Sequence, residues 1–296
     1  MKMRRWSFAS LAASAMLSLI EVAGAQSAPG GSRWPAASRI VVVPDVHGAY
    51  DELTDLLEAT GIVGAELEWA GGDARLVSLG DLLDRGPDSR RVMDLLMRLE
   101  REAPAAGGRV HVLLGNHELM NLTGDLRYVS ADEFAAFAAE ESDAMREAAF
   151  AEYRARRPEP ADDDEARVVF DATYPLGYFA HREAFAADGR YGSWLLGLPS
   201  LIVIGDTAFV HGGLPQAVAG TTADALNAQI AAELKRRAGD RDRQRDARDA
   251  RDAAALLRRE GFGLYAEIIT RLSPFDEERL AAFFDALDRR IRPMRR

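Results

Sequence analysis

The sequence predicts an α/β fold in which short buried strands alternate with helices. Three segments rich in Val and Leu each end in a polar turn: RIVVVPDVHG, ARLVSLGD and RVHVLLGNHE. The segments between them, YDELTDLLEA and SRRVMDLLMRLERE, have the apolar periodicity of helices. Strands that are apolar along their whole length are typical of a sheet that is covered on both faces. We therefore expect a sheet with helices on both faces and functional side chains at the carboxyl ends of its strands.

Composition narrows the classes of function. The chain has 296 residues, of which 48% are apolar and 28% charged, so it can bury a substantial core. Its net charge of -10 argues against a nucleic-acid partner, because a broad nucleic-acid-binding surface needs an excess of Lys and Arg. The chain contains no cysteine, which excludes disulfides, thiolate metal ligands and a cysteine nucleophile.

The N-terminal segment has the pattern of a signal peptide. A basic start, MKMRR, is followed by the apolar run WSFASLAASAMLSLI and by AGAQ, a pattern of small residues that predicts cleavage after Ala25. The apolar run is short for a bilayer span of about 20 residues, so we expect no stable membrane anchor. Residues 1–25 therefore predict export to the periplasm or out of the cell. Residues 26–38 are rich in Gly, Pro and Ser and predict a flexible leader, after which the domain extends over residues 39–296.

The pattern changes after the third strand. Residues 119–199 are rich in Ala, Glu and Arg and predict a helical insertion over the face that carries the polar turns. The segment LPSLIVIGDTAFVHGGL then predicts a hairpin that turns at Gly205 and Asp206 and returns to the sheet. Residues 229–260, which include RDARDARD, predict a solvated helix with opposite charges at helical spacing.

Five candidate metal ligands occur in the polar turns, at the ends of four successive strands: Asp45, His47, Asp81, Asn116 and His211. Oxygen and imidazole ligands without thiolate suit divalent ions such as Mn, Fe or Zn. A single Asp-x-His pattern is more often structural, but five such residues at strand ends favour a site for divalent ions.

The same turns supply residues for phosphate hydrolysis. Asp81 could bridge two ions and so hold a water whose lowered pKa makes it a hydroxide nucleophile near neutral pH. Arg85 offers a forked cation for phosphate oxygens. His117 could donate a proton to the leaving oxygen, and Asp84 could hydrogen-bond that imidazole.

These motifs resemble those of a known family. PDVHG, GDLLDRG, GNHE and HGG, in this order, resemble the signature of the calcineurin-like metallophosphoesterases, and specifically of the phosphoprotein phosphatase family. The longer segments GNHELMNLTGDLRYVS, YPLGYFAHREAF, GRYGSWL and DTAFVHGGL are similar to the bacterial Shewanella-like protein phosphatases, over about residues 39–225. The resemblance implies a central β-sandwich flanked by helices, which the strand pattern alone does not distinguish from an open sheet.

The resemblance also implies a role for each candidate residue and two divalent ions, with Mn favoured. It implies Asp45 and His47 on the first metal, Asp81 bridging, Asn116 and His211 on the second, His117 as the acid, Asp84 as its partner and Arg85 on phosphate.

The C-terminal third departs from the family pattern. Relatives carry a further metal-binding His in a Gly-His-Thr turn after the last strand. The five histidines of this chain are at positions 47, 111, 117, 181 and 211, and the chain ends in FFDALDRRIRPMRR. We therefore expect a C-terminally truncated relative in which the final strand and the last metal-binding turn are missing.

Two histidines lie outside the metal motifs. His111 is flanked by Val110 and Val112 within a strand, which favours a structural or surface role. His181 lies in AHREAF, a segment similar to one that faces the site in relatives, so it is a candidate for substrate binding alongside a role in helix packing.

Three functions are compatible with these features. The first is a metal-dependent phosphomonoester hydrolase that acts on phosphoserine, phosphothreonine or phosphotyrosine in proteins. The second is a hydrolase of dinucleoside polyphosphates, which shares the early motifs. The third is a catalytically impaired relative that binds phosphate or a partner, because one metal ligand is missing.

Overall fold

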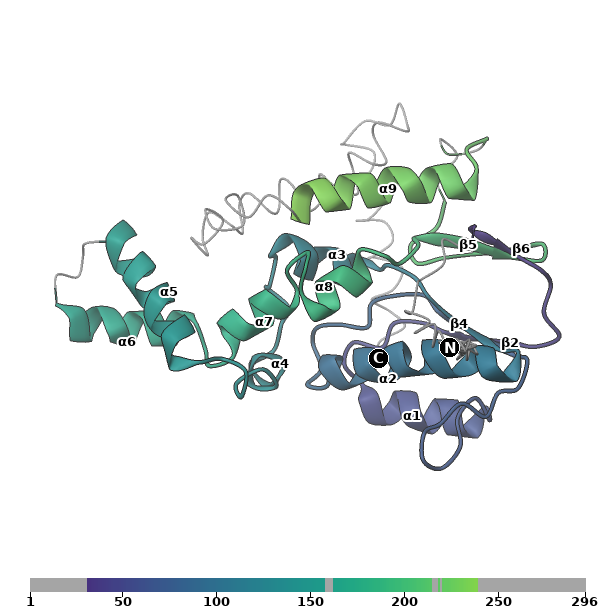
Figure 1. The fold of residues 1–296 in the computed structure, drawn as a ribbon, viewed down its shortest axis with the longest axis horizontal. Helices are drawn as coiled ribbons and strands as arrows, with labels where there is room; N and C mark the ends of the chain where they lie inside the picture. Colours follow the sequence, from purple (N-terminus) through teal and green to yellow (C-terminus); the bar gives the residue numbers. More distant parts are fainter. Residues whose placement is uncertain (1–30, 158–161, 215–217, 219, 239–296) are drawn as a thin grey trace, which may run out of the picture.

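Two three-stranded sheets pack face to face in the computed structural model, which describes residues 31–157, 162–214, 218 and 220–238 (Figure 1). The first sheet is parallel, with the order β2-β3-β4. The second has the order β1-β5-β6, with β1 parallel to β5 and β5 antiparallel to β6. The strands are β1 (Arg33–Trp34), β2 (Ile40–Val43), β3 (Arg75–Ser78), β4 (Arg109–Val112), β5 (Leu201–Ile204) and β6 (Thr207–Val210). The central β-sandwich implied by the resemblance is confirmed.

Helices cover one face of the parallel sheet and the second sheet covers the other. Leu76 of β3 is buried in the core that includes side chains of α1 (Tyr50–Ala59) and α2 (Ser89–Glu102). Its neighbour Val77 is buried with Ile202 and Ile204 of β5, between the two sheets. The expectation of helices on both faces of this sheet is therefore wrong, because an apolar strand looks the same whichever layer covers it.

Helix α9 (Ala223–Ala238) covers the outer face of the second sheet (Figure 1). Leu226 of α9 packs against Leu201 of β5. Asn227 fixes the start of β5, because its Oδ1 accepts from the backbone N–H groups of Ser200 and Leu201, at 3.0 Å each. The sandwich is thus a layer between α1 and α2 on one side and α9 on the other.

The N-terminal part of the described chain belongs to the fold. Residues 31–38 were expected to be part of a flexible leader, but Arg33 and Trp34 form β1 in register with Val203 and Ile204. The Trp34 ring packs edge-on against His111, with ring centroids 5.0 Å apart. Pairing to β5 and burial against the sandwich hold this segment despite its Gly, Pro and Ser content.

The hairpin turns at Gly205 and Asp206, as predicted, because Ile204 pairs with Thr207 across a two-residue turn. Gly205 has φ +62°, a conformation that favours glycine. The hairpin adds to β1 rather than to the parallel sheet, so its expected return to that sheet is wrong.

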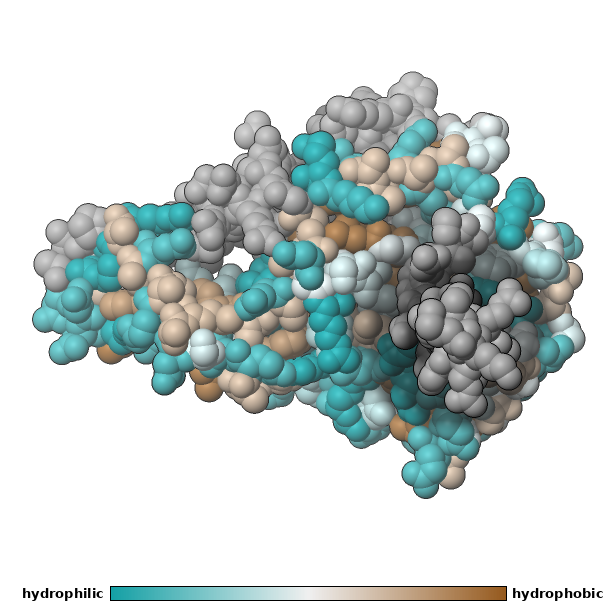
Figure 2. Space-filling view, viewed as in Figure 1, coloured by the Kyte–Doolittle hydropathy of each residue, from teal (hydrophilic) through white to brown (hydrophobic). Residues whose placement is uncertain are grey.

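The region between β4 and β5 is helical. Its elements are α3 (Asn116–Thr123), α4 (Ala131–Ala135), α5 (Asp143–Arg156), α6 (Asp163–Thr173), α7 (Tyr178–Ala184) and α8 (Arg190–Leu195), and the 3-10 helix η1 (Ala103–Ala106) precedes β4. Helices α5 and α6 form an arm that extends away from the sheets (Figure 1). The arm has its own small core, made by Tyr153, Phe170 and Tyr174, and its surface mixes apolar and hydrophilic residues (Figure 2). The insertion therefore does not lie over the strand ends along its whole length.

Several sequence predictions fall outside the described residues: the signal peptide at 1–25, residues 26–30, the charged run from 239 onward and the missing last strand and turn. Within the described ranges, no helix has the length and apolar character needed to cross a bilayer.

His111 lies inside the sandwich and makes the fold sensitive to acid. Its side chain is 6% exposed, and Nε2 has no hydrogen-bond partner among the described residues. Burial, together with the charges of Arg109 and Arg75, lowers the pKa of His111 to about 4. The unfolded chain, with an ordinary His pKa of about 6.5, binds more protons than the folded chain between these two values. The free energy of unfolding therefore falls as the pH drops below about 6.5.

We expect His111→Leu to remove this dependence, because Leu fills the buried position with no group that titrates. Between pH 7 and pH 5 the wild type should lose about 2 kcal/mol more free energy of unfolding than the variant. Urea unfolding of both proteins at the two pH values measures the difference. Equal losses in the two proteins would show that His111 does not carry the effect.

Candidate metal and phosphate site

The carboxyl ends of β2, β3 and β4 and the end of β6 bring the five predicted ligands together. Asp45 and His47 follow β2, Asp81 follows β3, Asn116 begins α3 after β4, and His211 follows β6. Because β2, β3 and β4 are parallel in one sheet, their ends lie at the same edge.

Asp81 is at the centre of this cluster. Its Oδ2 lies 3.8 Å from His47 Nε2 and 3.4 Å from His211 Nε2. Asp45 faces both histidines, with oxygens 3.9 Å from His47 Nε2 and 3.8 Å from His211 Nδ1. Asn116 Oδ1 lies 3.1 Å from His211 Nε2.

The histidines are oriented as metal ligands usually are. His47 Nδ1 donates to the carbonyl of Leu83 at 2.9 Å, and His211 Nδ1 donates to that of Leu79 at 3.1 Å. Each Nε2 is thereby directed at Asp81, and the buried Nε2 of His47 has no hydrogen-bond partner in the described part of the chain. A ring fixed through one nitrogen by a carbonyl, with a second nitrogen that has no partner, fits a divalent ion, and His47 is such a ring. Nε2 of His211 contacts Asn116 Oδ1 instead.

Two groups of potential ligand atoms share Asp81. One group is formed by His47, Asp81 and His117, the other by Asp45, Asp81 and His211, and within each group the atoms lie within 4.8 Å of one another. Asp81 is the carboxylate common to both groups. Asp45 belongs to the group that contains His211, and it lies at nearly the same distance from His47.

The electrostatics keep Asp81 ionised. Burial alone would raise its pKa, but the hydrogen bond with His211 and the backbone N–H of His117 bring the pKa of Asp81 below its ordinary value. In return, the hydrogen bond to Asp81 raises the pKa of His211. Binding of an ion here would displace a proton from His211, so metal affinity should increase with pH.

A second buried pair lies beside this cluster. His117 Nδ1 lies 2.6 Å from Asp84 Oδ2, and both residues are at most 1% exposed. Asn121 Nδ2 donates to the other Asp84 oxygen at 2.9 Å. Arg85 Nη2 lies 3.3 Å from His117 Nε2. Because guanidinium only donates, Nε2 is the acceptor and the ring proton is on Nδ1.

The backbone of the site turns is strained. Four of its residues have positive φ although none is glycine, which is a costly conformation that clusters at functional sites. They are His47 (φ 50°), Asp81 (φ 52°), Asp84 (φ 70°) and Arg85 (φ 69°). Such turns persist only where surrounding contacts hold them.

Glu118 holds the Asp81 turn and was missed from the sequence. It is fully buried and accepts from the backbone N–H groups of Asp81 at 2.9 Å, Leu82 at 2.8 Å and Gly115 at 2.7 Å. Burial, reinforced by the nearby Asp81 charge, raises the pKa of Glu118 to about 7. Its place three residues after Gly115 is the spacing of a capping box, the one sequence signal that points to it.

Glu133 of α4 holds the next turn. Its Oε1 accepts from the backbone N–H of Asp84 at 3.0 Å and from the hydroxyl of Ser89. Its Oε2 accepts from the N–H of Ser130 at 2.8 Å. The spacing of Ser130 and Glu133 signals a helix start, but not the contact with Asp84. The first part of the insertion thus supports the site through α4.

His181 is buried among aromatic side chains. It is 2% exposed on α7 and packs among Phe134, Phe137 and Phe185, with ring centroids 4.4 to 5.2 Å away. Burial, with the charge of Arg182, lowers the pKa of His181 well below its ordinary value. The aromatic contacts support the helix-packing alternative over substrate binding, because they bury the ring.

Comparison with known proteins identifies the family. Residues 38–246 match the family model described as calcineurin-like phosphoesterase. The chain belongs to this family. The resemblance drawn from the four motifs is therefore confirmed.

Relatives of this calcineurin-like phosphoesterase include protein phosphatases. The chain is 36% identical over 99 residues to Shewanella-like protein phosphatase 2 of Arabidopsis thaliana, covering 33% of this chain and 25% of that protein. It is 27% identical over 176 residues to Shewanella-like protein phosphatase 1 of Plasmodium berghei. This match covers 60% of this chain and 39% of that protein. A symmetrical bis(5'-nucleosyl)-tetraphosphatase of Cronobacter sakazakii is 37% identical over 78 residues. This match covers 26% of this chain and 23% of that protein.

A solved structure with a similar fold is the cold-active protein-tyrosine phosphatase of a psychrophilic Shewanella species. The TM-score is 0.50 at 28% identity, and the match covers 69% of this chain and 51% of that chain. The phosphoesterase chain thus spans about half of this neighbour and 25% to 39% of the two protein phosphatases named above.

Proposed function

We propose that this chain is a metal-dependent phosphomonoester hydrolase that acts on phosphoproteins. The observation that carries the proposal is the buried Asp84–His117 pair, whose Nε2 faces Arg85 at the edge of the ligand cluster around Asp81. A phosphate clamp, a proton carrier and a site for divalent ions thus converge at one place, as phosphoryl transfer to water requires.

Each residue of the site would have a separate role in phosphate hydrolysis. Two divalent ions, when bound, would lower the pKa of a water and neutralise charge on the phosphoryl group. Arg85 would bind phosphate oxygens through its forked N–H donors. In its doubly protonated form, His117 would deliver the Nε2 proton to the leaving oxygen, while Nδ1–H donates to Asp84, which keeps the ring oriented. This form requires Arg85, which now donates to Nε2, to turn toward the phosphate.

Manganese is the metal we propose, with Fe or Zn as alternatives, because the donors are carboxylate, amide and imidazole groups without thiolate. Five protein ligands are available among the described residues: Asp45, His47, Asp81, Asn116 and His211.

Hydrolysis of dinucleoside polyphosphates is the second candidate, and the match to the tetraphosphatase of Cronobacter sakazakii favours it. That match covers 26% of the chain, whereas the match to the Plasmodium berghei protein phosphatase covers 60%. The longer match supports a protein phosphatase.

The test compares substrates on purified residues 26–296 with MnCl2. A phosphotyrosine peptide, a phosphoserine peptide and diadenosine tetraphosphate are assayed in parallel, each with and without a chelator. We expect metal-dependent release of phosphate from at least one peptide at a higher kcat/KM than cleavage of the dinucleotide. Faster cleavage of the dinucleotide would favour the second candidate. Folded protein without activity on any substrate would favour a catalytically impaired relative.

We also propose that the protein is exported, on the basis of the N-terminal signal pattern in residues 1–25. Cell fractionation of the full chain fused to a C-terminal tag tests this, and mature protein that stays in the cytoplasm would contradict it.

A further inference from the structure

One side of α6 is apolar and exposed on the arm. Val168 is 69% exposed and Val169 42%, and the exposed Ala172 follows them at helical spacing, so these three side chains share one side of the helix and are called the α6 face. Leu176, just beyond the helix, is 56% exposed. The other side of α6 carries Phe170, which is 1% exposed in the small core of the arm. Adjoining apolar side chains that remain exposed are typical of an interaction surface.

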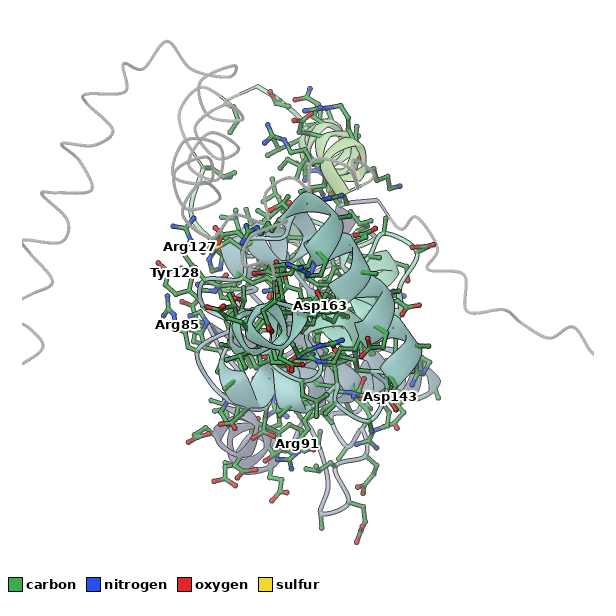
Figure 3. All side chains as sticks on the ribbon, turned by 90° about the vertical axis from the view of Figure 1, so that its left-hand side faces the viewer. Arg85, Arg91, Arg127, Tyr128, Asp143 and Asp163 are labelled. Atoms are coloured by element: carbon green, nitrogen blue, oxygen red, sulfur yellow. The ribbon has the colours of Figure 1, made fainter. Side chains whose placement is uncertain are left out.

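The α6 face is acidic at one end. Asp164 and Glu165, both exposed, precede Val168 and Val169 by one turn on the same side of the helix. The described ion pairs of α5 and α6 use other carboxylates: Glu141, Glu147, Asp163 and Asp171. Asp164 and Glu165 therefore have no arginine partner in the described part of the chain. Figure 3 faces the arm and labels Asp163, the first residue of α6. A segment that covers the α6 face should be apolar on one side and basic at the end that reaches these carboxylates.

Residues 274–292, which lie outside the described residues, have this pattern in their sequence. Ser273 and Pro274 are a helix-start signal and Pro293 is a stop signal, so the sequence predicts a helix between them. Its apolar residues are spaced for one side of a helix: Leu280, Phe283, Phe284, Leu287 and Ile291. Basic residues gather at its end: Arg289, Arg290 and Arg292.

The path of the chain brings this segment toward the arm. Helix α9 ends at Ala238, at its lightest green end in Figure 1, on the side from which the arm extends. Residues 239–273 follow and, even as a continuous helix, would span about 50 Å. Helix α6 begins at the outer end of the arm and runs back toward α7 and the sheets (Figure 1). A segment that arrives from the sheets and runs outward is antiparallel to α6, and its basic end comes last.

We propose that residues 274–292 dock on the α6 face of the same chain, as a helix antiparallel to α6. In this arrangement the basic end of the segment reaches Asp164 and Glu165, which have the opposite charge. The large ring of Phe284 lies opposite the small Ala172, and large and small side chains that face each other interdigitate.

The test forms disulfides in a chain that has no cysteine of its own. Purified residues 26–296 carry Glu165→Cys with Ile291→Cys in one variant, and Glu165→Cys with Leu280→Cys in the matched control. In the docked helix position 291 lies opposite position 165, whereas position 280 lies about three turns away, beyond the reach of a disulfide. We expect the disulfide within one chain to form at least about tenfold faster in the first variant, because docking raises the local concentration of the two thiols. Mass spectrometry of unreduced digests and non-reducing gels measure the rates.

A third variant tests whether the α6 face carries the docking. It adds Val168→Asp and Val169→Asp to the first pair and should react at the rate of the control, because an apolar partner does not solvate the new charges. An unchanged rate in this variant, or equal rates in the first variant and the control, would overturn the docking. A control faster than the first variant would overturn the antiparallel direction, and disulfides that link two copies would overturn docking within one chain. None of these measurements depends on the proposed function.

Discussion

Asp81→Asn is expected to lower kcat for an aryl phosphate by at least about 100-fold, more than the loss of an outer-shell partner usually costs at a metal site. Asn has nearly the same shape, and its side-chain oxygen can still accept from the backbone N–H of His117, a bond of 3.0 Å in the wild type. The substitution removes the one carboxylate common to both groups of potential ligands. The fold should therefore survive while affinity for divalent ions falls.

The matched control is Asp73→Asn, which removes the same charge from an exposed position just before the other end of β3. Phosphate release from the aryl phosphate with MnCl2 gives the rates, and calorimetric titration with Mn²⁺ gives affinity independently of turnover. The control should match the wild type in both. An Asp81→Asn protein that keeps wild-type turnover would remove Asp81 from the proposed mechanism.

The ligand cluster could be predicted because its signal is local. Each ligand directly follows an apolar run, and parallel strands necessarily bring their carboxyl ends to one edge. Asp45, Asp81 and Asn116 are therefore expected to meet without any detailed knowledge of side-chain packing, because they follow β2, β3 and β4. His211 follows β6 of the other sheet, so its arrival at the site depends on how the two sheets pack. The sequence pattern shows which side chains reach this edge, but not that Asp45 lies between His47 and His211.

Features that depend on contacts distant in the sequence were not predictable in the same way. Trp34 lies in a segment whose composition is typical of a loop, yet pairing with β5 and contact with His111 make it part of the sandwich. His181 carries a functional residue type in a motif of relatives, yet three phenylalanines enclose it. In both cases tertiary packing outweighs the local signal.

The supporting carboxylates were missed for a different physical reason. Glu118 and Glu133 bind backbone N–H groups, and any residue at Asp81, Leu82 or Asp84 would present the same group. No pairing of side-chain types therefore marks these contacts in the sequence. They become visible only once the strained turns and their buried donors are located in space.

Glu118→Ala is expected to lower the free energy of unfolding by at least about 3 kcal/mol. The substitution leaves three backbone N–H groups, those of Asp81, Leu82 and Gly115, without their acceptor, and a buried unsatisfied donor costs about 1 to 3 kcal/mol. Gly115 also sits so close to the turn that a Cβ there would lie 2.3 Å from Asp81 Oδ1, so a side chain at position 115 could not replace the carboxylate.

Urea unfolding in the presence of a chelator measures this loss without any contribution from bound metal. Glu118→Gln should fall between wild type and Ala, because one amide oxygen still accepts while the amide nitrogen faces a donor. Glu140→Ala is the matched control: its carboxylate pairs with Arg90 at a half-exposed position, so its removal should cost at most about 1 kcal/mol. If Glu118→Ala cost no more than this control, the strained Asp81 turn would have to be held by its other contacts, the backbone bonds from Val46 and His47 to the carbonyl of Asp81.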